Sequence, residues 1–267
     1  MKKTTGIRYI AIAMISVLAI TVNAAEDNIN SPSAEQSIEV EGIKNPEWKS
    51  YKILFQGFEA FEKNRNLAPA ASLRFALRPL QDGLSMDGVT LHIESPQYRI
   101  PIALDEHHRF SLPQDHLLAD DEAELLVNRK KNVMSIRPDV RTPGLAPGVR
   151  RLGDLRLECH VRWEIQKDEL SFIKRNAFRM LGGPCKSQTV KTFYFADGTL
   201  KSAWLSVPGR KIQLEIAGNG RLFRPPLHDT MWDDEALVTL EFADRAASAH
   251  RTPEGGSSEE KHENASQ

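Results

Sequence analysis

The 267-residue sequence lacks the short motifs by which the common classes of enzyme are recognised. It contains no Gly-x-Ser-x-Gly nucleophile elbow, no His-Glu-x-x-His pair, no phosphate-binding glycine loop and no Cys-x-x-Cys. These are the signatures of serine hydrolases, zinc proteases, nucleotide-binding enzymes and thiol oxidoreductases. The sequence therefore points to no cofactor, and we favour a non-catalytic protein over an enzyme.

Long hydrophobic runs are also scarce, and the one that exists lies near the N-terminus. Residues 9–22 form an apolar segment that follows basic residues and ends at Val22-Asn23-Ala24, a small-residue pattern typical of cleavage. The run is short for a membrane span. We predict a cleaved bacterial signal peptide over residues 1–24, with an uncleaved anchor as the alternative. The mature protein is then periplasmic or secreted and is not an integral membrane protein.

No single sign of charge dominates the chain, which has 35 Lys and Arg against 36 Asp and Glu. The charges are nevertheless unevenly placed. Residues 141–224 hold 16 basic and 7 acidic residues, and the segments on either side are acidic. The basic segment predicts an anionic partner. Outside the cytoplasm, such a partner is an anionic glycan, a lipid headgroup or an envelope protein rather than nucleic acid.

Cysteine is rare, and the two that occur are Cys159 and Cys185. Cys159 lies in residues 155–165, where apolar and polar side chains alternate without a break, a pattern that predicts a half-buried strand. Apolar groups at helical spacing then predict a helix over residues 167–181, and the sequence Gly-Gly-Pro at 182–184 ends it.

The lengths of these two elements predict a disulfide. The strand climbs about 20 Å beyond Cys159 at roughly 3.3 Å per residue, and the helix returns about 20 Å at roughly 1.5 Å per residue. If the helix lies antiparallel on the core face of the strand, the glycine turn brings Cys185 back to the level of Cys159. We therefore predict a Cys159–Cys185 disulfide, which requires an oxidising compartment.

The whole chain is predicted to be mainly β, in an α+β arrangement. An aromatic stripe over residues 46–64 indicates an N-terminal helix, and alternating strands from Ser72 onward indicate a small antiparallel β-sandwich. An antiparallel meander follows, with the helix 167–181 packed on its sheet. The predicted division is a signal peptide (1–24), a disordered arm (25–45), a helix with a sandwich-like domain (46–140), a linker (141–153), an antiparallel β domain (154–244) and a disordered tail (245–267).

Four arginines of the basic segment are the candidates for binding an anion: Arg156, Arg162, Arg175 and Arg179. The first two fall on the exposed face of the predicted strand, and the other two lie toward the end of the predicted helix. The competing interpretation is that Glu158 and Glu164 pair with the arginines on the same face of the strand. Surface pairs of this kind add little stability.

A histidine-rich turn at residues 105–116 is the nearest approach to a catalytic site. His107, His108 and His116 lie there among carboxylates, and imidazole and carboxylate groups bind transition metals. The alternative is a solvated turn. From the sequence we expect an exported, non-catalytic binding or structural protein of the bacterial cell envelope. The alternative function is an envelope hydrolase or metal-dependent enzyme that uses this turn.

Overall fold

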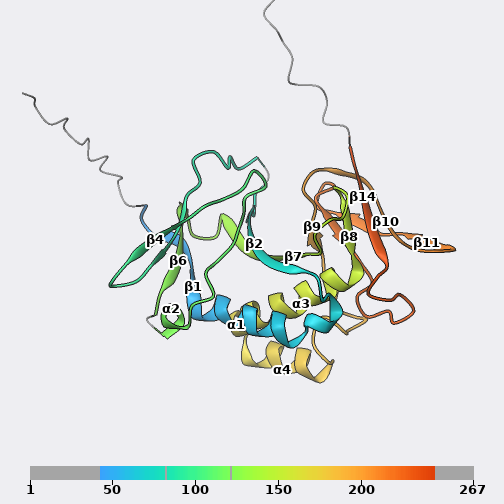
Figure 1. Ribbon diagram of the computed structural model, residues 1–267, viewed down its shortest axis with the longest axis horizontal. Coiled ribbons are helices and arrows are strands. Elements are labelled where there is room, and N and C mark those ends of the chain that lie inside the picture. The colour runs from blue at the N-terminus through green and yellow to red at the C-terminus, as the bar shows by residue number, and fades with distance from the viewer. Residues whose placement is uncertain (1–42, 82, 121, 244–267) are drawn as a thin grey trace, which may run out of the picture. The chain divides into compact units, whose positions relative to one another are not determined.

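The computed structural model describes residues 43–81, 83–120 and 122–243 (Figure 1). The predicted signal peptide, nearly all of the predicted arm and the predicted tail lie outside these ranges. The described residues belong to one compact unit, Gly42–Gln267. They form four antiparallel sheets with helices packed against them, which confirms the predicted α+β fold class.

Two sheets and the helices α1 and α2 surround the first hydrophobic core, to which α3 (Leu152–Gln166) also contributes. The elements are β1 (Pro46–Ser50), α1 (Tyr51–Lys63), β2 (Ser72–Pro79), β3 (Leu91–Glu94), β4 (Arg99–Ile102), β5 (Arg109–Phe110), α2 (His116–Asp120), β6 (Glu124–Lys130) and β7 (Met134–Arg141). The strand orders are β1-β6-β3-β4 and β5-β2-β7. Phe75, Ile93 and Leu125 come from the strands, and Leu54 and Phe58 of α1 join them in the core.

Two further sheets surround the second core. Their strands are β8 (Val149–Arg151), β9 (Tyr194–Phe195), β10 (Leu200–Val207), β11 (Arg210–Gln213), β12 (Glu215–Ala217), β13 (Leu222–Arg224) and β14 (Leu237–Phe242). The orders are β11-β10-β14-β8 and β12-β13-β9. Leu205, Phe223 and Val238 are fully buried in this core. The meander predicted for this part of the chain is therefore split between two sheets.

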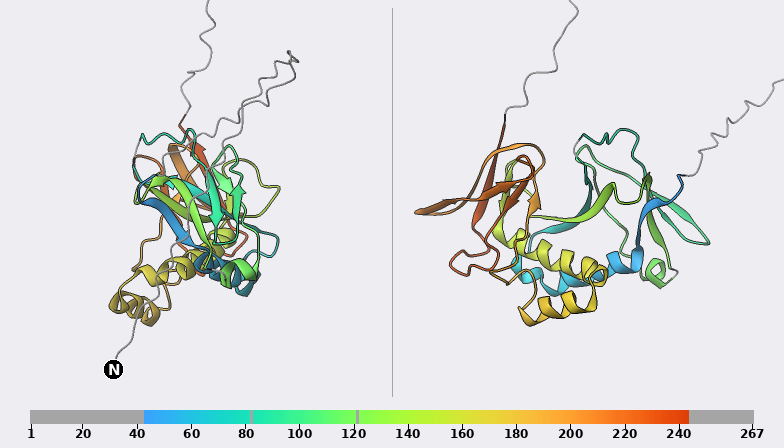
Figure 2. Two further views of the ribbon diagram at one scale, coloured as in Figure 1. Left: turned by 90° about the vertical axis from the view of Figure 1, so that its left-hand side faces the viewer. Right: turned by 180° about the vertical axis from the view of Figure 1, so that it is seen from behind.

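Residues 155–165 are helical, so the predicted strand is wrong. They belong to α3 (Leu152–Gln166), which lies beside α1 in all views (Figures 1 and 2). Leu157, Val161 and Ile165 pack in the first core, whereas Leu155 and Cys159 pack in the second. At about 100° per residue, these two sets project from opposite sides of the helix.

The two opposite stripes of α3 explain why its sequence resembles a strand. One stripe takes every fourth position through 157, 161 and 165, and the other takes 155 and 159. Together with Trp163, which contacts Phe178 of α4, they fill the odd-numbered positions from 155 to 165. A helix with one buried face leaves gaps in such a series, but a helix buried on two sides does not. The alternation therefore reports two cores rather than one face of a sheet.

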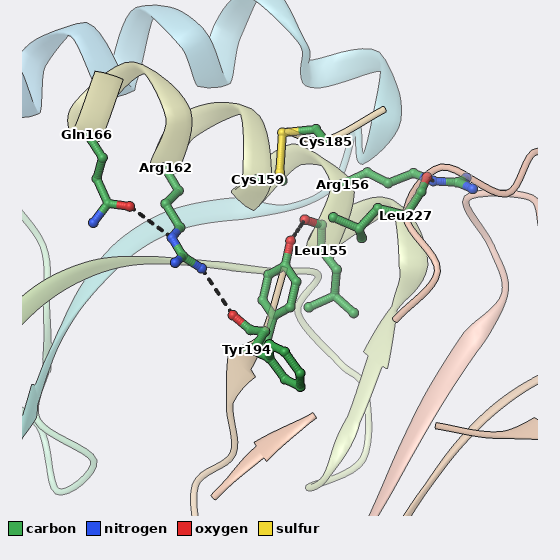
Figure 3. The surroundings of a disulfide bond; sticks show 9 residues. Leu155, Arg156, Cys159, Arg162, Gln166, Cys185, Tyr194 and Leu227 are labelled. Carbon is green, nitrogen blue, oxygen red and sulfur yellow. Dashed lines mark hydrogen bonds between the residues drawn. A yellow bond between two sulfur atoms is a disulfide. The ribbon is translucent and has the colours of Figure 1, made fainter. Parts of the chain in front are cut away.

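The helix predicted over residues 167–181 is shorter than expected and does not pack on a sheet. A 3₁₀ turn over Lys167–Glu169 precedes α4 (Phe172–Met180), whose Phe178 ring contacts Trp163 of α3. A disulfide joins Cys159 to Cys185 (Figure 3). Cys159 precedes Trp163 in α3, whereas its partner Cys185 follows Phe178, the partner of Trp163. The order of contacts is therefore reversed, so α4 runs antiparallel to α3.

The disulfide confirms the predicted pairing although one of the two elements is of the wrong type. Beyond Cys159, α3 advances about 10 Å to its end, and α4 returns about 12 Å, at roughly 1.5 Å per residue in each. The Cα atoms of the two cysteines are 5.7 Å apart. The outward and returning lengths cancel as predicted, but two helices form the hairpin.

The helix predicted over residues 46–64 begins five residues later than expected. Residues Pro46–Ser50 pair with β6 as strand β1, and α1 starts at Tyr51. Gly57 lies where α1 packs on α3, and a Cβ atom there would lie 2.8 Å from Cδ1 of Ile165. The glycine therefore permits the close approach of the two helices.

The segment predicted as a linker, residues 141–153, contains regular structure. Arg141 ends β7, β8 follows at Val149–Arg151, and α3 begins at Leu152. The backbone N–H groups of Leu152 and Gly153 donate to the carbonyl oxygens of Ala236 and Asp234. This segment is thereby attached to the chain just before β14.

Candidate functional site

Helix α4 carries the most exposed apolar surface of the described chain. The exposed fractions are 68% for Phe172, 79% for Ile173, 89% for Met180 and 52% for Leu181. At about 100° per residue, these four side chains and Ala177 fall within one half of the helix circumference. Large apolar residues gathered on one face, rather than scattered singly, mark a surface that binds something.

Basic side chains border this apolar face on both sides. On the same helical projection Lys174 lies just beyond Leu181, and Arg179 lies just beyond Phe172. Both are exposed. From Leu170 to Lys191 the sequence has five basic residues and no acidic one. We call the exposed side of α4, with Phe172, Ile173, Lys174, Arg179, Met180 and Leu181, the α4 surface.

Three contacts fix α4 with this surface outward. The ring of Phe178, on the opposite side of the helix, meets the Trp163 ring edge-on at 5.6 Å between centroids. Arg175 donates to Asp168 over 2.7 Å. The disulfide anchors the chain five residues beyond the helix. The helix was predicted to pack on its sheet, but its apolar residues Ile173 and Met180 face away from the core.

Arg156, predicted to bind an anion, is fully engaged within the protein. Its guanidinium group donates to Asp234 over 2.6 Å and to the carbonyl oxygens of Leu227, Asp229 and Trp232 over 2.8–3.0 Å. Figure 3 shows the side chain reaching from α3 toward Leu227. These bonds hold the loop before β14 against α3, so this arginine has a structural task in the fold.

The other three candidate arginines differ in what they contact. Arg162 donates to Gln166 and to the carbonyl oxygen of Phe193, each over 3.0 Å (Figure 3). Arg175 forms the ion pair with Asp168. Arg179 is exposed, and within the described part of the chain it has no ion pair. The four arginines do not form one group, and only Arg179 belongs to the α4 surface.

The competing interpretation paired Glu158 and Glu164 with Arg156 and Arg162, and the structure gives both carboxylates other partners. Glu164 pairs with Lys167, one turn further along. Glu158 is buried, and it accepts from Arg150 over 2.6 Å and from the backbone N–H of Val140 over 3.0 Å. Burial raises the pKa of Glu158, and the nearby charge of Arg150 offsets only part of that rise.

A second group of charges lies on the face of β2 and β7 that points away from the first core. We call it the arginine cluster: Arg78, Arg109, Arg141 and Arg150 with Asp139 and Asp197. The carboxylate of Asp197 forms salt bridges with Arg109 over 2.6 Å, Arg78 over 3.0 Å and Arg141 over 3.1 Å. Asp139 pairs with Arg109 and with Arg141. Asp197 and Gly198 follow β9, which pairs with β13 rather than with β10, and the turn that they form supplies this carboxylate.

The cluster shifts the pKa of each of its buried members toward the charged form. Burial alone would raise the pKa of Asp197, but the charges of Arg141, Arg109 and Arg78 outweigh burial and hold the pKa well below its usual range. The pKa of Asp139 is lowered for the same reason. The pKa of Arg109 is raised, because Asp139 and Asp197 outweigh its burial. Each charge therefore stabilises its neighbours in the ionised state.

A cleft of about 1170 Å³ opens beside the arginine cluster. Its charged lining consists of equal numbers of cations and carboxylates: Arg74, Arg109, Arg141, Arg150, Asp105, Asp139, Asp154 and Asp197. Arg74 pairs with Asp105 over 2.8 Å, so it too is engaged. An anion entering the cleft would have to displace a carboxylate from an arginine. The arrangement therefore suits a structural role better than anion capture.

The structure does not bring the three candidate histidines together. His107 is exposed and lies 3.6 Å from Glu106. His108 has a positive φ of 58° in the turn before β5. His116 begins α2, and its ring packs 4.5 Å from that of Phe55. Across the residues that the structure describes, no three His, Cys, Asp or Glu side chains form a group that could hold a metal ion.

Comparison with known proteins identifies no relative of this chain. No protein-family model matches the chain, and neither the curated proteins nor the solved structures include a match. In the described ranges, none of the helices has both the length and the apolar composition needed to span a membrane.

Proposed function

We propose that this protein is an exported, non-catalytic binding protein of the bacterial cell envelope, and that it engages an anionic partner through the α4 surface. The observation that carries the proposal is the composition of that surface. Large exposed apolar side chains are bordered by Lys174 and Arg179, in a stretch of 22 residues, 170–191, without a single acidic group. The disulfide supports export, because such bonds persist in oxidising compartments.

The two kinds of side chain have different tasks in this proposal. The basic residues attract an anionic partner over the screening distance of the solvent, about 8 Å at physiological salt. Apolar contact then holds the partner at short range, since burying apolar area is favourable and does not depend on salt in the same way. Binding should therefore weaken as salt rises without vanishing completely.

The test is retention of the exported protein on immobilised heparin, used as a generic polyanion, over a range of salt concentrations. The variant Lys174→Glu with Arg179→Glu reverses both cations of the α4 surface and should elute at much lower salt than the wild type. The matched control, Lys52→Glu with Lys201→Glu, makes the same change in net charge at two exposed lysines outside α4. Equal loss in both double variants would show that net charge alone governs retention, and the proposal would fail.

Export has its own measurement. Expression of the full-length chain in a bacterium, followed by fractionation and sequencing of the N-terminus, should place the protein outside the cytoplasm with Ala25 as its first residue. An intact Met1 in the cytoplasmic fraction would contradict this part of the proposal.

A further inference from the structure

We infer that the α4 surface docks on an anionic phospholipid bilayer, with α4 lying in the plane of the interface. This inference rests on the proposed function and names the class of partner. Its starting point is the kind of side chain presented. A polyanionic glycan is bound by cations and hydrogen-bond donors, and it has no use for four large exposed apolar groups such as Ile173 and Met180. A bilayer has both a charged layer and an apolar interior within a few ångströms of each other.

The order of side chains around α4 matches this layering. On the helical projection Ile173 and Met180 lie at the centre of the surface, with the half-buried Asn176 beside them. Phe172 and Leu181 lie on either side of this centre, and Lys174 and Arg179 lie at the two edges. When the apolar centre enters the acyl boundary, the edges lie at the level of the lipid phosphates. Long basic side chains bury their methylene groups and keep the charged end in the headgroup layer. The α4 surface can thus contact the acyl chains and the headgroups at the same time.

The dimensions favour a helix that lies on the bilayer rather than one that crosses it. α4 has nine residues and spans about 12 Å from first to last at 1.5 Å per residue, against a hydrocarbon core of about 30 Å. Its remaining side is occupied by the contact between Phe178 and Trp163. Only the outward face is free to enter lipid, and the disulfide and the Arg175–Asp168 pair hold it in that orientation.

Charge argues against a second copy of the chain as the occupant. Two α4 surfaces placed face to face would bring Lys174 and Arg179 of each copy against those of the other. With no acidic residue between Leu170 and Lys191 to compensate, such a contact carries like-charge repulsion. An anionic bilayer supplies the complementary sign.

The experiment measures binding of the exported protein to vesicles of phosphatidylethanolamine and phosphatidylglycerol, with phosphatidylcholine vesicles as the neutral surface. The variant Ile173→Ser with Met180→Ser removes the most exposed apolar groups but no charge. It should bind the anionic vesicles at least about tenfold more weakly, as expected when several buried CH₂ groups are lost. Its retention on heparin should be unchanged. The matched control, Leu117→Ser with Met231→Ser, alters residues of similar exposure elsewhere and should bind as the wild type does.

Depth of insertion gives an independent measurement. The variant Phe172→Trp adds a fluorophore to the α4 surface, and brominated acyl chains should quench the added emission once vesicles are present. Absence of quenching, or unchanged vesicle binding by the serine variant, would overturn the bilayer inference. If salt-dependent heparin retention still required Lys174 and Arg179, the proposed function would survive that result. If heparin retention were also independent of those residues, both would fall.

Discussion

At Asp197, one carboxylate serves three guanidinium groups, and the acid stability of the protein should depend on it. Burial opposes ionisation, but Arg141, Arg109 and Arg78 lower the pKa of Asp197 well below its usual range. A group whose pKa is depressed in the folded state contributes stability above its unfolded pKa of about 3.9. That contribution is lost as the pH falls through the folded value.

The variant Asp197→Asn should therefore lower the free energy of unfolding at neutral pH by about 2 kcal/mol, because it leaves buried Arg109 with one carboxylate fewer. Below about pH 4 the free energy of unfolding should also fall less steeply with decreasing pH in this variant than in the wild type. Denaturant unfolding across that pH range measures both effects. Glu106→Gln, at a highly exposed side chain, is the control and should change neither.

Arg137 and Arg109 should respond oppositely to the same substitution. Both point to the polar face of their sheet, but burial, together with the charge of Arg162, lowers the pKa of Arg137 to about 10. The pKa of Arg109 is raised by its two aspartates. Arg137→Met should raise the free energy of unfolding by about 1 kcal/mol, since a half-buried and poorly compensated charge is removed. Arg109→Met should lower it by about 3 kcal/mol. Thermal and denaturant unfolding of the two variants checks the signs, and two losses of similar size would refute the distinction.

At the scale of elements, the crossing of α1 and α3 depends on Gly57. Alanine in a helix interior is ordinarily better than glycine by about 1 kcal/mol. Here the added Cβ would lie 2.8 Å from Cδ1 of Ile165, which is buried and packed. We expect Gly57→Ala to lower the free energy of unfolding by about 1–2 kcal/mol, because overpacking outweighs propensity.

A second substitution shows whether this contact is the cause. Ile165→Val removes the Cδ1 atom that the new methyl group would meet. The double variant should then be more stable than Gly57→Ala alone, although Ile165→Val by itself is destabilising. Additive losses in the double-mutant cycle would mean that the cost of Gly57→Ala arises elsewhere.

The helices also show how far the sequence could predict this fold. Most strands follow from alternation, because β2, β3, β10 and β14 each have a core on one side. The same rule wrongly predicts a strand where α3 lies, since the helix has stripes at 157, 161, 165 and at 155, 159 that face different cores. No local pattern separates a helix between two cores from a strand on one. The information that distinguishes them lies in contacts distant in sequence.

The candidate site was predictable only in part for a related reason. A basic segment was evident, and a helix near residues 172–180 with apolar residues at helical spacing was expected, but that helix was predicted to pack on a sheet. Helical spacing says that such residues share a face, not which surroundings that face has. The arginine cluster was missed because Asp197 reaches Arg78 and Arg109 from 119 and 88 residues away.

At the scale of the whole molecule, the disulfide closes a separation of 26 residues that includes all of α4. Replacing both cysteines with serine should lower the free energy of unfolding by roughly 3.5 kcal/mol, as the chain-entropy model gives for a loop of this size. Denaturant unfolding measures the loss, and reducing agent should destabilise the wild type by a similar amount but leave the serine variant unchanged. A reducing agent without effect on the wild type would show that the bond contributes nothing.

The position of α3 between two cores has a consequence for how the molecule comes apart. Leu157 and Val161 belong to one core, and Leu155 and Cys159 to the other, on a single rigid rod. If one core unfolded alone, the apolar residues of α3 that pack in it would be exposed to water. The loss of one core therefore destabilises the other. Calorimetry should accordingly record a single unfolding transition whose calorimetric enthalpy equals its van't Hoff enthalpy, as expected for two-state unfolding.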